Sequence, residues 1–119
     1  MTQQIGRLPE AAASPRVVGG VLKWYAGDTF RLQVQLRMTD QNRNPVAIRE
    51  GQKVEFIFRD HRDRQVHRAI FQDVEGDCVT LVFDEDITAL FPAGDYTYDV
   101  VYSGYVRKTL AHRAPICVE

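Results

Sequence analysis

The feature that most constrains the fold is a series of short strand-like runs separated by turn-forming residues. Residues 30–38 alternate strictly between apolar and polar side chains, the pattern of a strand with one buried face. Further runs rich in β-branched and aromatic residues lie at 53–59, 66–72, 78–83, 96–102, 105–110 and 116–118. Clusters of Gly, Pro, Asn and Asp separate them. This pattern predicts an all-β fold, an antiparallel β-sandwich of seven or eight strands.

The chain of 119 residues has the length of one domain. Residues 1–16 have few apolar side chains and two prolines, so we expect an extended N-terminal arm there. The β-sandwich domain then spans residues 17–119. Residues 84–91 predict a single helical turn, because the acids at their start suit a helix N-terminus.

Residues 90–100 lead from a short crossover into an aromatic strand. Alternation places Tyr96, Tyr98 and Val100 on one face of that strand. In many sandwiches a tyrosine at this position donates a hydrogen bond from its hydroxyl to the crossover backbone, an arrangement called the tyrosine corner. We expect Tyr96 to be the corner residue. An aromatic core strand is a second interpretation, and it is compatible with the first.

Four motifs together resemble the immunoglobulin-like β-sandwich modules of bacteriophage tail, baseplate and fibre proteins. They are the strand opener at 27–30, the turn ending at 44–46, the strand at 54–58 and the corner at 92–100. The resemblance spans about residues 21–118, although the usual Asp-Gly turn is replaced by residues 42–45, Asn-Arg-Asn-Pro. The residues that define the expected immunoglobulin-like fold are Gly27, Asp28, Gly94, Tyr96 and Tyr98.

The resemblance also implies a function. Such a protein is a virion structural component, made in the host cytoplasm, that assembles with other virion proteins and catalyses no reaction. A carbohydrate- or ligand-binding module is an alternative, in which Trp24, Tyr25 and Tyr105 would stack on sugar rings. A capsid decoration protein is a further alternative with the same assembly physics.

Composition and motifs exclude several other classes. The 15 basic and 16 acidic side chains nearly cancel, which argues against a nucleic-acid binder. There is no membrane-length apolar run and no secretory signal pattern, so we expect a soluble intracellular product without a membrane partner. The three histidines, His61, His67 and His112, accompany no hydrolase, metalloprotease or phosphate-loop motif. We therefore expect neither an enzyme nor a cofactor.

Metal binding has weak candidates. Cys78 and Cys117 lack the spacing of metal ligands, and we favour buried free thiols while leaving a disulfide open. The acids at 84–86 could bind Ca²⁺ together with Asp77 or Asp95, but they lack the spacing of a dedicated calcium loop. A solvated helix start is the favoured interpretation, so no metal site is assigned.

Charge is unevenly distributed along the chain. Residues 23–68 hold ten basic and six acidic side chains, whereas residues 69–106 hold eight acidic and no basic ones. If these segments form different faces, copies would attract head to tail in a homo-oligomer; if their strands interleave, the field averages away. Trp24 is either a contact residue or a core plug at the sandwich end. The candidate contact residues are Ile5, Leu8, Trp24, Arg62, Arg64, Asp84 and Asp86.

Overall fold

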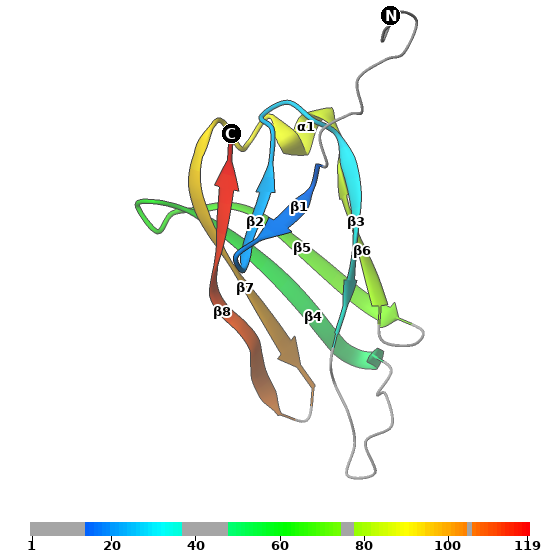
Figure 1. The fold of residues 1–119 in the computed structure, drawn as a ribbon. Coiled ribbons are helices and arrows are strands. Elements are labelled where there is room, and N and C mark those ends of the chain that lie inside the picture. The colour runs from blue at the N-terminus through cyan, green and yellow to red at the C-terminus, as the bar shows by residue number, and fades with distance from the viewer. Residues whose placement is uncertain (1–13, 37–47, 75–77, 105) are drawn as a thin grey trace, which may run out of the picture.

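The computed structural model describes residues 14–36, 48–74, 78–104 and 106–119. Within these ranges the chain forms eight strands and one short helix (Figure 1). The elements in chain order are β1 Arg16–Val18, β2 Val21–Trp24, β3 Phe30–Gln35, β4 Ile48–Asp60, β5 Gln65–Val74, β6 Cys78–Phe83, α1 Glu85–Thr88, β7 Gly94–Ser103 and β8 Arg107–Val118. The prediction of a fold built mainly from strands is therefore confirmed.

The strands form two sheets of unequal width. Six of them make one sheet in the order β1-β2-β8-β7-β4-β5, and β3 pairs with β6 in a second sheet of two strands. Figure 1 shows β3 and β6 as a separate layer beside the larger sheet, with α1 and the C-terminus at the same end. Within the described part of the chain, the narrow second sheet leaves part of the inner face of the larger sheet without a covering strand.

The prediction of a wholly antiparallel arrangement is wrong at one pair. β2 and β8 run parallel, with Leu22 aligned to Ile116 and Trp24 aligned to Val118. Parallel neighbours cannot be joined by a tight turn, and here nearly the whole chain separates them. A sequence pattern reports each strand but not the direction of a partner so distant along the chain, which is why this pair was missed.

The hydrophobic core lies between the two sheets. On β3, the apolar residues Phe30, Leu32 and Val34 face the core while the polar residues between them are exposed, as the alternation predicts. Residues 37 and 38 of that predicted strand lie outside the described residues. The largest fully buried side chains are Trp24, Phe56, Phe58, Phe83, Phe91, Ile116 and Val54. Burying one such side chain contributes about 1.5–3 kcal/mol to folding.

The predicted tyrosine corner is confirmed. The Tyr96 hydroxyl donates a hydrogen bond of 2.6 Å to the Pro92 carbonyl, and burial raises the pKa of Tyr96. The bond ties the start of β7 to the crossover that follows α1. Gly94 has a φ of 154°, a conformation that residues with a Cβ rarely adopt, so the glycine is needed where the crossover enters β7.

The predicted helical turn is also confirmed. The Asp84 carboxylate accepts a hydrogen bond of 3.0 Å from the Ile87 N–H, which caps α1, and Glu85 and Asp86 occupy its first turn. The opener at 27–30 begins with a turn in which the Asp28 N–H donates to the Tyr25 carbonyl at 3.0 Å. Gly27 has a φ of 88°, as the third position of such a turn requires.

Residues 107–110 of one predicted run and the run 116–118 belong to the single strand β8, whereas residue 105 lies outside the described residues. The polar residues between them hide its continuity in the sequence. At Arg113 the backbone takes a φ of 49°, and its N–H donates to the Asp99 carboxylate at 2.6 Å instead of to a strand carbonyl. A side chain thus replaces a missing ladder bond, and the strand continues past this irregularity to Pro115, which pairs with Thr97.

β1 and β2 were not predicted as strands, since runs of three and four residues carry too little periodicity to identify. β1 begins at Arg16, next to the predicted boundary between arm and domain. Residues 1–13, which make up most of the predicted arm and include Ile5 and Leu8, lie outside the described residues.

Candidate functional site

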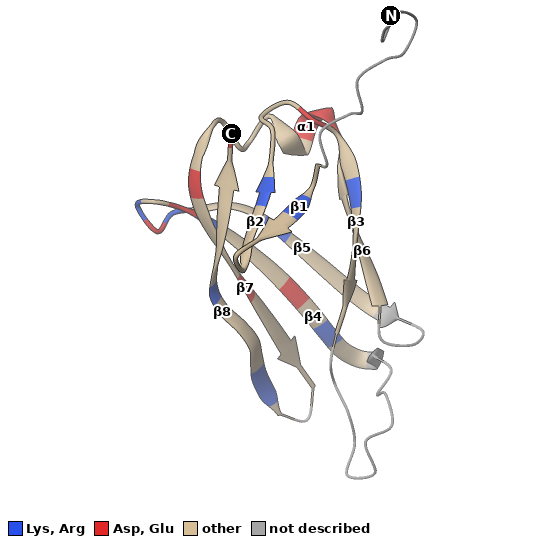
Figure 2. Cartoon of the chain, viewed as in Figure 1, with Lys and Arg blue, Asp and Glu red and all other residues tan. Residues whose placement is uncertain are grey.

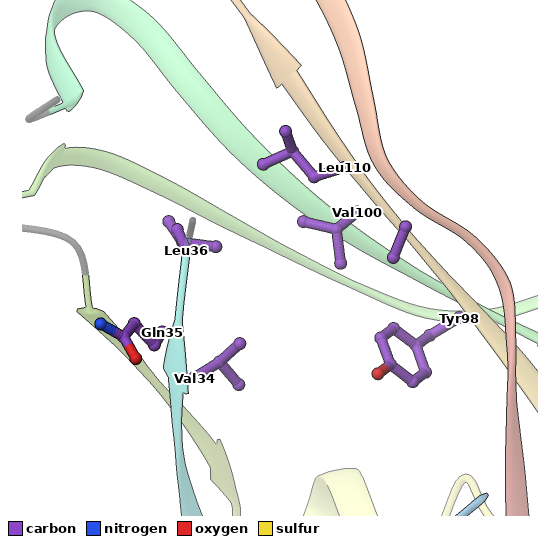
Figure 3. Close-up of a pocket in the computed structure, with 7 residues that line it drawn as sticks. Val34, Gln35, Leu36, Tyr98, Val100 and Leu110 are labelled. Atoms are coloured by element: carbon purple, nitrogen blue, oxygen red, sulfur yellow. The ribbon is translucent and has the colours of Figure 1, made fainter. Parts of the chain in front are cut away.

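The most distinctive opening on the described surface is a cleft between the two sheets, beside β3 (Figure 3). We call it the lateral cleft. It has a volume of about 280 Å³ and is lined by Val34, Gln35, Leu36, Tyr98, Val100, Leu110 and Ala111. Figure 3 shows the residues of β3 on one side of the space and those of β7 and β8 on the other. The cleft exists because no described strand of the small sheet covers this part of β7 and β8.

Five of the seven described residues that line the lateral cleft are aliphatic. A register irregularity between β7 and β8 follows the pair Val100 and Ala111, and it places the consecutive residues Leu110 and Ala111 together at the cleft. Leu110 is 36% exposed, a high value for a large apolar side chain. Such a surface favours contact with another apolar group over contact with water.

Polar groups in the lateral cleft are few. Tyr98 is half-buried, its ring packs near Phe58 with centroids 6.2 Å apart, and burial raises the pKa of its hydroxyl. The hydroxyl therefore stays neutral at physiological pH and can donate or accept one hydrogen bond. Gln35 supplies the other polar side chain of the lining. The described residues of the lining carry no carboxylate, imidazole or amine.

The outer face of the larger sheet carries a network of charges around Asp99. The Asp99 carboxylate forms an ion pair with Arg59 and lies 3.2 Å from Nδ1 of His112. Burial alone would raise the pKa of Asp99, but the Arg113 N–H and the Arg59 guanidinium outweigh burial and lower it. Because Arg59 comes from the basic segment and Asp99 from the acidic one, the two segments interleave in this sheet.

A second buried carboxylate is also paired with basic side chains. Glu55 on β4 pairs with Lys53 and with Arg68, and these cations lower its pKa. All three residues belong to the basic segment, so this cluster is neutralised within that segment, whereas the Arg59–Asp99 pair joins the two segments. The acids of α1 remain as a separate group at one end of the molecule, where Figure 2 shows them in red.

The structure corrects the prediction that Trp24 is a contact residue. Its side chain has no exposed surface and packs between Phe30, Phe83 and Phe91, with ring centroids 5.2–5.5 Å away. It is therefore the core plug of the sandwich end and cannot contact a partner in the folded chain. The sugar-stacking surface loses its central member for the same reason. Tyr25 is 38% exposed, with Arg16 over its ring, and residue 105 lies outside the described residues.

The charged tip at 60–64 joins β4 to β5. The Asp60 carboxylate accepts backbone N–H bonds from Arg62 and Arg64 at 2.9 and 3.0 Å and pairs with the Arg64 guanidinium at 3.1 Å. The bonds from Arg64 and Arg62 lower the pKa of Asp60. Arg62 and Arg64 are exposed, as a contact role requires, but much of the polarity of this tip is satisfied within the tip itself.

The remaining contact candidates lie at the α1 end. Asp84 and Asp86 are both exposed, and the Asp84 carboxylate already caps the helix. Neither residue lines the lateral cleft, and both lie at the α1 end, apart from the tip that carries Arg62 and Arg64, so the structure does not gather the predicted contacts into one site. Among the described residues no three His, Cys, Asp or Glu side chains group as a metal site would require.

The histidines and cysteines lie apart from one another. His61 is exposed in the charged tip, and His67 packs on Phe58 with ring centroids 5.7 Å apart, so burial lowers its pKa. Cys78 and Cys117 are both half-buried and are not joined by a disulfide in this structure.

A second hollow of about 370 Å³ lies between α1 and the turn at 25–28. Its lining includes Glu85, Thr88 and Phe91, and it is wider and shallower than the lateral cleft. The described residues contain no helix long and apolar enough to cross a membrane. Of the two openings, the lateral cleft is the more enclosed.

The sequence did not single out the lateral cleft. Val34 and Leu36 were predicted as core residues of a strand, and Val100 as part of the aromatic strand. Their exposure to an opening depends on how many strands cover them, which local patterns do not report.

Comparisons of the chain with protein-family models, with curated proteins and with solved structures give no match.

Proposed function

We propose that this chain is a non-enzymatic structural protein of a bacteriophage virion, in the tail, baseplate or fibre-attachment region, that works by binding other proteins. In this proposal the sandwich is immunoglobulin-like, as its opener and corner motifs suggest. The observation that carries the binding role is the lateral cleft, an apolar opening beside a sheet of only two described strands. The virion location rests on the motif resemblance.

The chemistry of the openings supports binding rather than catalysis. Acid–base or nucleophilic catalysis needs titratable groups held together at a pocket. The lateral cleft offers one neutral phenol and one amide. The strongly bonded carboxylates Glu55 and Asp99 instead lie on the outer face of the sheet, where their cation partners hold them in ion pairs.

The virion role is tested by locating the chain in particles. Intact phage particles from the source would be purified, separated into head and tail fractions, and assayed by quantitative mass spectrometry. The proposal expects a fixed copy number in the tail fraction. A fixed copy number in the head fraction would instead identify a capsid decoration protein, and absence from intact particles would overturn the proposal.

Self-assembly is tested by native mass. The full chain would be measured at low and high salt, beside a variant that starts at residue 17. The homo-oligomer proposal expects a defined oligomer that weakens without the arm. Because the two charged segments interleave in the larger sheet, weakening in high salt would require the acids of α1 to contact a basic surface of another copy. A monomer under every condition would overturn the homo-oligomer and leave assembly on other proteins.

A further inference from the structure

We propose that β5 is a self-association site, at which the free edges of β5 in two copies of this chain pair antiparallel across a two-fold axis and join the two larger sheets. This inference rests on the homo-oligomer part of the proposed function and names the contact that forms it. Backbone hydrogen bonds between the two edges supply affinity, and the side chains that face each other fix the register.

The two edges of the larger sheet differ in length and in sequence. β1 forms one edge, has three residues and directly follows Pro15. β5 forms the other edge and has ten residues, none of them proline or glycine. A short strand and a proline are two ways in which proteins prevent pairing at a sheet edge. The β1 edge has both, whereas the β5 edge has neither.

The regular part of the β5 edge spans residues 67–72. These residues pair with consecutive residues of β4, from His67 opposite Phe58 to Gln72 opposite Lys53. A register shift next to Phe58 ends the regular run toward the charged tip. No described strand pairs with the other edge of β5. Alternate residues of this edge therefore present backbone N–H and C=O groups that a further strand can bond.

The side chains along this edge alternate in exposure. Arg68, Ile70 and Gln72 are exposed. Ala69 and Phe71, which lie between them, are half-buried and pack against the core. Ile70 is 49% exposed, a high value for an apolar side chain in the middle of a strand. A strand paired with this edge would cover part of that apolar surface.

The order of these residues suits pairing with a reversed copy of itself, as a two-fold axis requires. With Ile70 on the axis, each Ile70 lies opposite the same residue of the other copy, and Arg68 lies opposite Gln72. On the inner face, the small side chain of Ala69 lies opposite the large ring of Phe71. Moving the axis to Ala69 would place Arg68 opposite the apolar Ile70, so the first register is favoured.

A second copy fits this edge better than an unrelated strand, because one pairing covers both free edges. The Arg68 guanidinium is already paired with the Glu55 carboxylate of its own chain, so the contact brings no unpaired like charges together at this position. A contact of this kind closes on itself and gives a dimer. It uses no residue of the N-terminal arm, so removal of the arm and changes in β5 are separate perturbations.

The test measures dimerisation of the full chain by sedimentation velocity over a range of concentrations. The wild type should form a reversible dimer. Ile70→Lys places two ammonium groups opposite each other at the axis and should raise the dimer Kd at least about tenfold, because like charges replace an apolar pair. Val82→Lys is the matched control, since Val82 is a β-branched residue with 42% exposure on β6 of the smaller sheet.

Charge changes at Gln72 test the register. Gln72→Glu should lower the dimer Kd, because the carboxylate lies opposite Arg68 of the other copy, and Gln72→Lys should raise it by repulsion from the same residue. Gln72 is exposed, so both variants serve even if Ile70→Lys fails to fold. Far-UV circular dichroism checks the fold of each variant.

Ile70→Cys tests the position of the axis independently. Opposed Cα atoms of an antiparallel pair lie about 4.5–5.5 Å apart, within the range of about 4.4–6.8 Å that a disulfide spans. Mild oxidation should therefore join two copies of this variant into a covalent dimer. The wild type and Val82→Cys, treated in the same way, should form far less of it.

Three outcomes would overturn the inference: a wild type that is monomeric at every concentration, equal effects of Ile70→Lys and Val82→Lys, or a shift of the Kd in the same direction for both Gln72 variants. Failure here with the chain present in the tail fraction would leave the proposed virion function standing. Dimerisation through β5 with the chain absent from virions would overturn the virion function and leave this contact in place.

Discussion

Two regions of the sandwich interior, the α1 end and the lateral cleft, differ in how completely side chains fill them. At the α1 end, Trp24, Phe83 and Phe91 pack with ring centroids 5.2–5.7 Å apart, and each is nearly or fully buried. At the lateral cleft, smaller aliphatic side chains face an opening of about 280 Å³, and Leu110 is 36% exposed.

The α1 end is therefore the part of the core that stabilises the fold, and the lateral cleft is the part that the proposed function uses for binding. Large aromatic rings with many close neighbours stabilise the folded chain, because each buries a large apolar area in defined geometry. At the lateral cleft, Leu36 and Val100 are buried as well, but Leu110 is partly exposed and contributes less to stability than a fully buried side chain. Substitutions at the two ends should therefore have effects of very different size.

The largest effect is expected at the closed end. Phe91→Ala should lower the free energy of unfolding by about 3–5 kcal/mol, because it empties a site surrounded by aromatic rings. Urea unfolding followed by far-UV circular dichroism measures the change. A loss below about 1 kcal/mol would show that the closed end does not carry the stability we assign to it.

A smaller effect is expected at Asp99, which supports the strand carrying Tyr98 and Val100. Asp99→Asn should cost about 2 kcal/mol at neutral pH, since it weakens hydrogen bonds made to a charged group. Because the pKa of Asp99 is lowered in the folded chain, this stability is present above the unfolded pKa of about 3.9. It is lost as the pH falls through the lower folded pKa.

Urea unfolding of the wild type and Asp99→Asn between pH 7 and pH 2 measures this dependence. The gap between the two proteins should be constant near neutral pH and shrink below about pH 4. A gap that stays unchanged down to the lowest pH would contradict the role given to the Asp99 charge.

Tyr96→Phe should cost about 1 kcal/mol, because it removes the hydroxyl that bonds to the Pro92 carbonyl and keeps the ring. Thermal unfolding provides the measurement. Tyr102→Phe is the control, since the Tyr102 hydroxyl is not part of the corner. Equal losses for the two variants would contradict a specific corner contribution.

The smallest effect is expected at the lateral cleft. Leu110→Ala should change the free energy of unfolding by less than about 1 kcal/mol, because the side chain is already partly exposed. The same urea experiment compares it with Phe91→Ala. If Leu110→Ala cost as much as Phe91→Ala, the contrast between the two ends would be wrong.

Much of the local structure was predictable because short-range physics determines it. Alternation identified β3, a run rich in β-branched residues identified β6, Asp84 marked the start of α1, and Tyr96 was placed at the corner. Each of these depends on residues a few positions apart, where strand period, capping and turn dihedrals act directly.

The candidate site was not predictable in the same way. Trp24 carries the same local sequence whether it plugs the core or lies on the surface, and its burial follows from rings supplied by β3, β6 and the segment after α1. Arg59 and Asp99 come from segments of opposite charge, and only the pairing of β4 with β7 brings them together.

The sequence by itself determined the strand-rich fold, the polar and apolar faces of its strands, the helix cap and the tyrosine corner. The tertiary structure alone decided the parallel pairing of β2 with β8, the two-strand width of the described second sheet and the lateral cleft that results. The physical reason is range: local patterns act over a few residues, whereas strand order and sheet width arise from contacts between segments far apart in the chain.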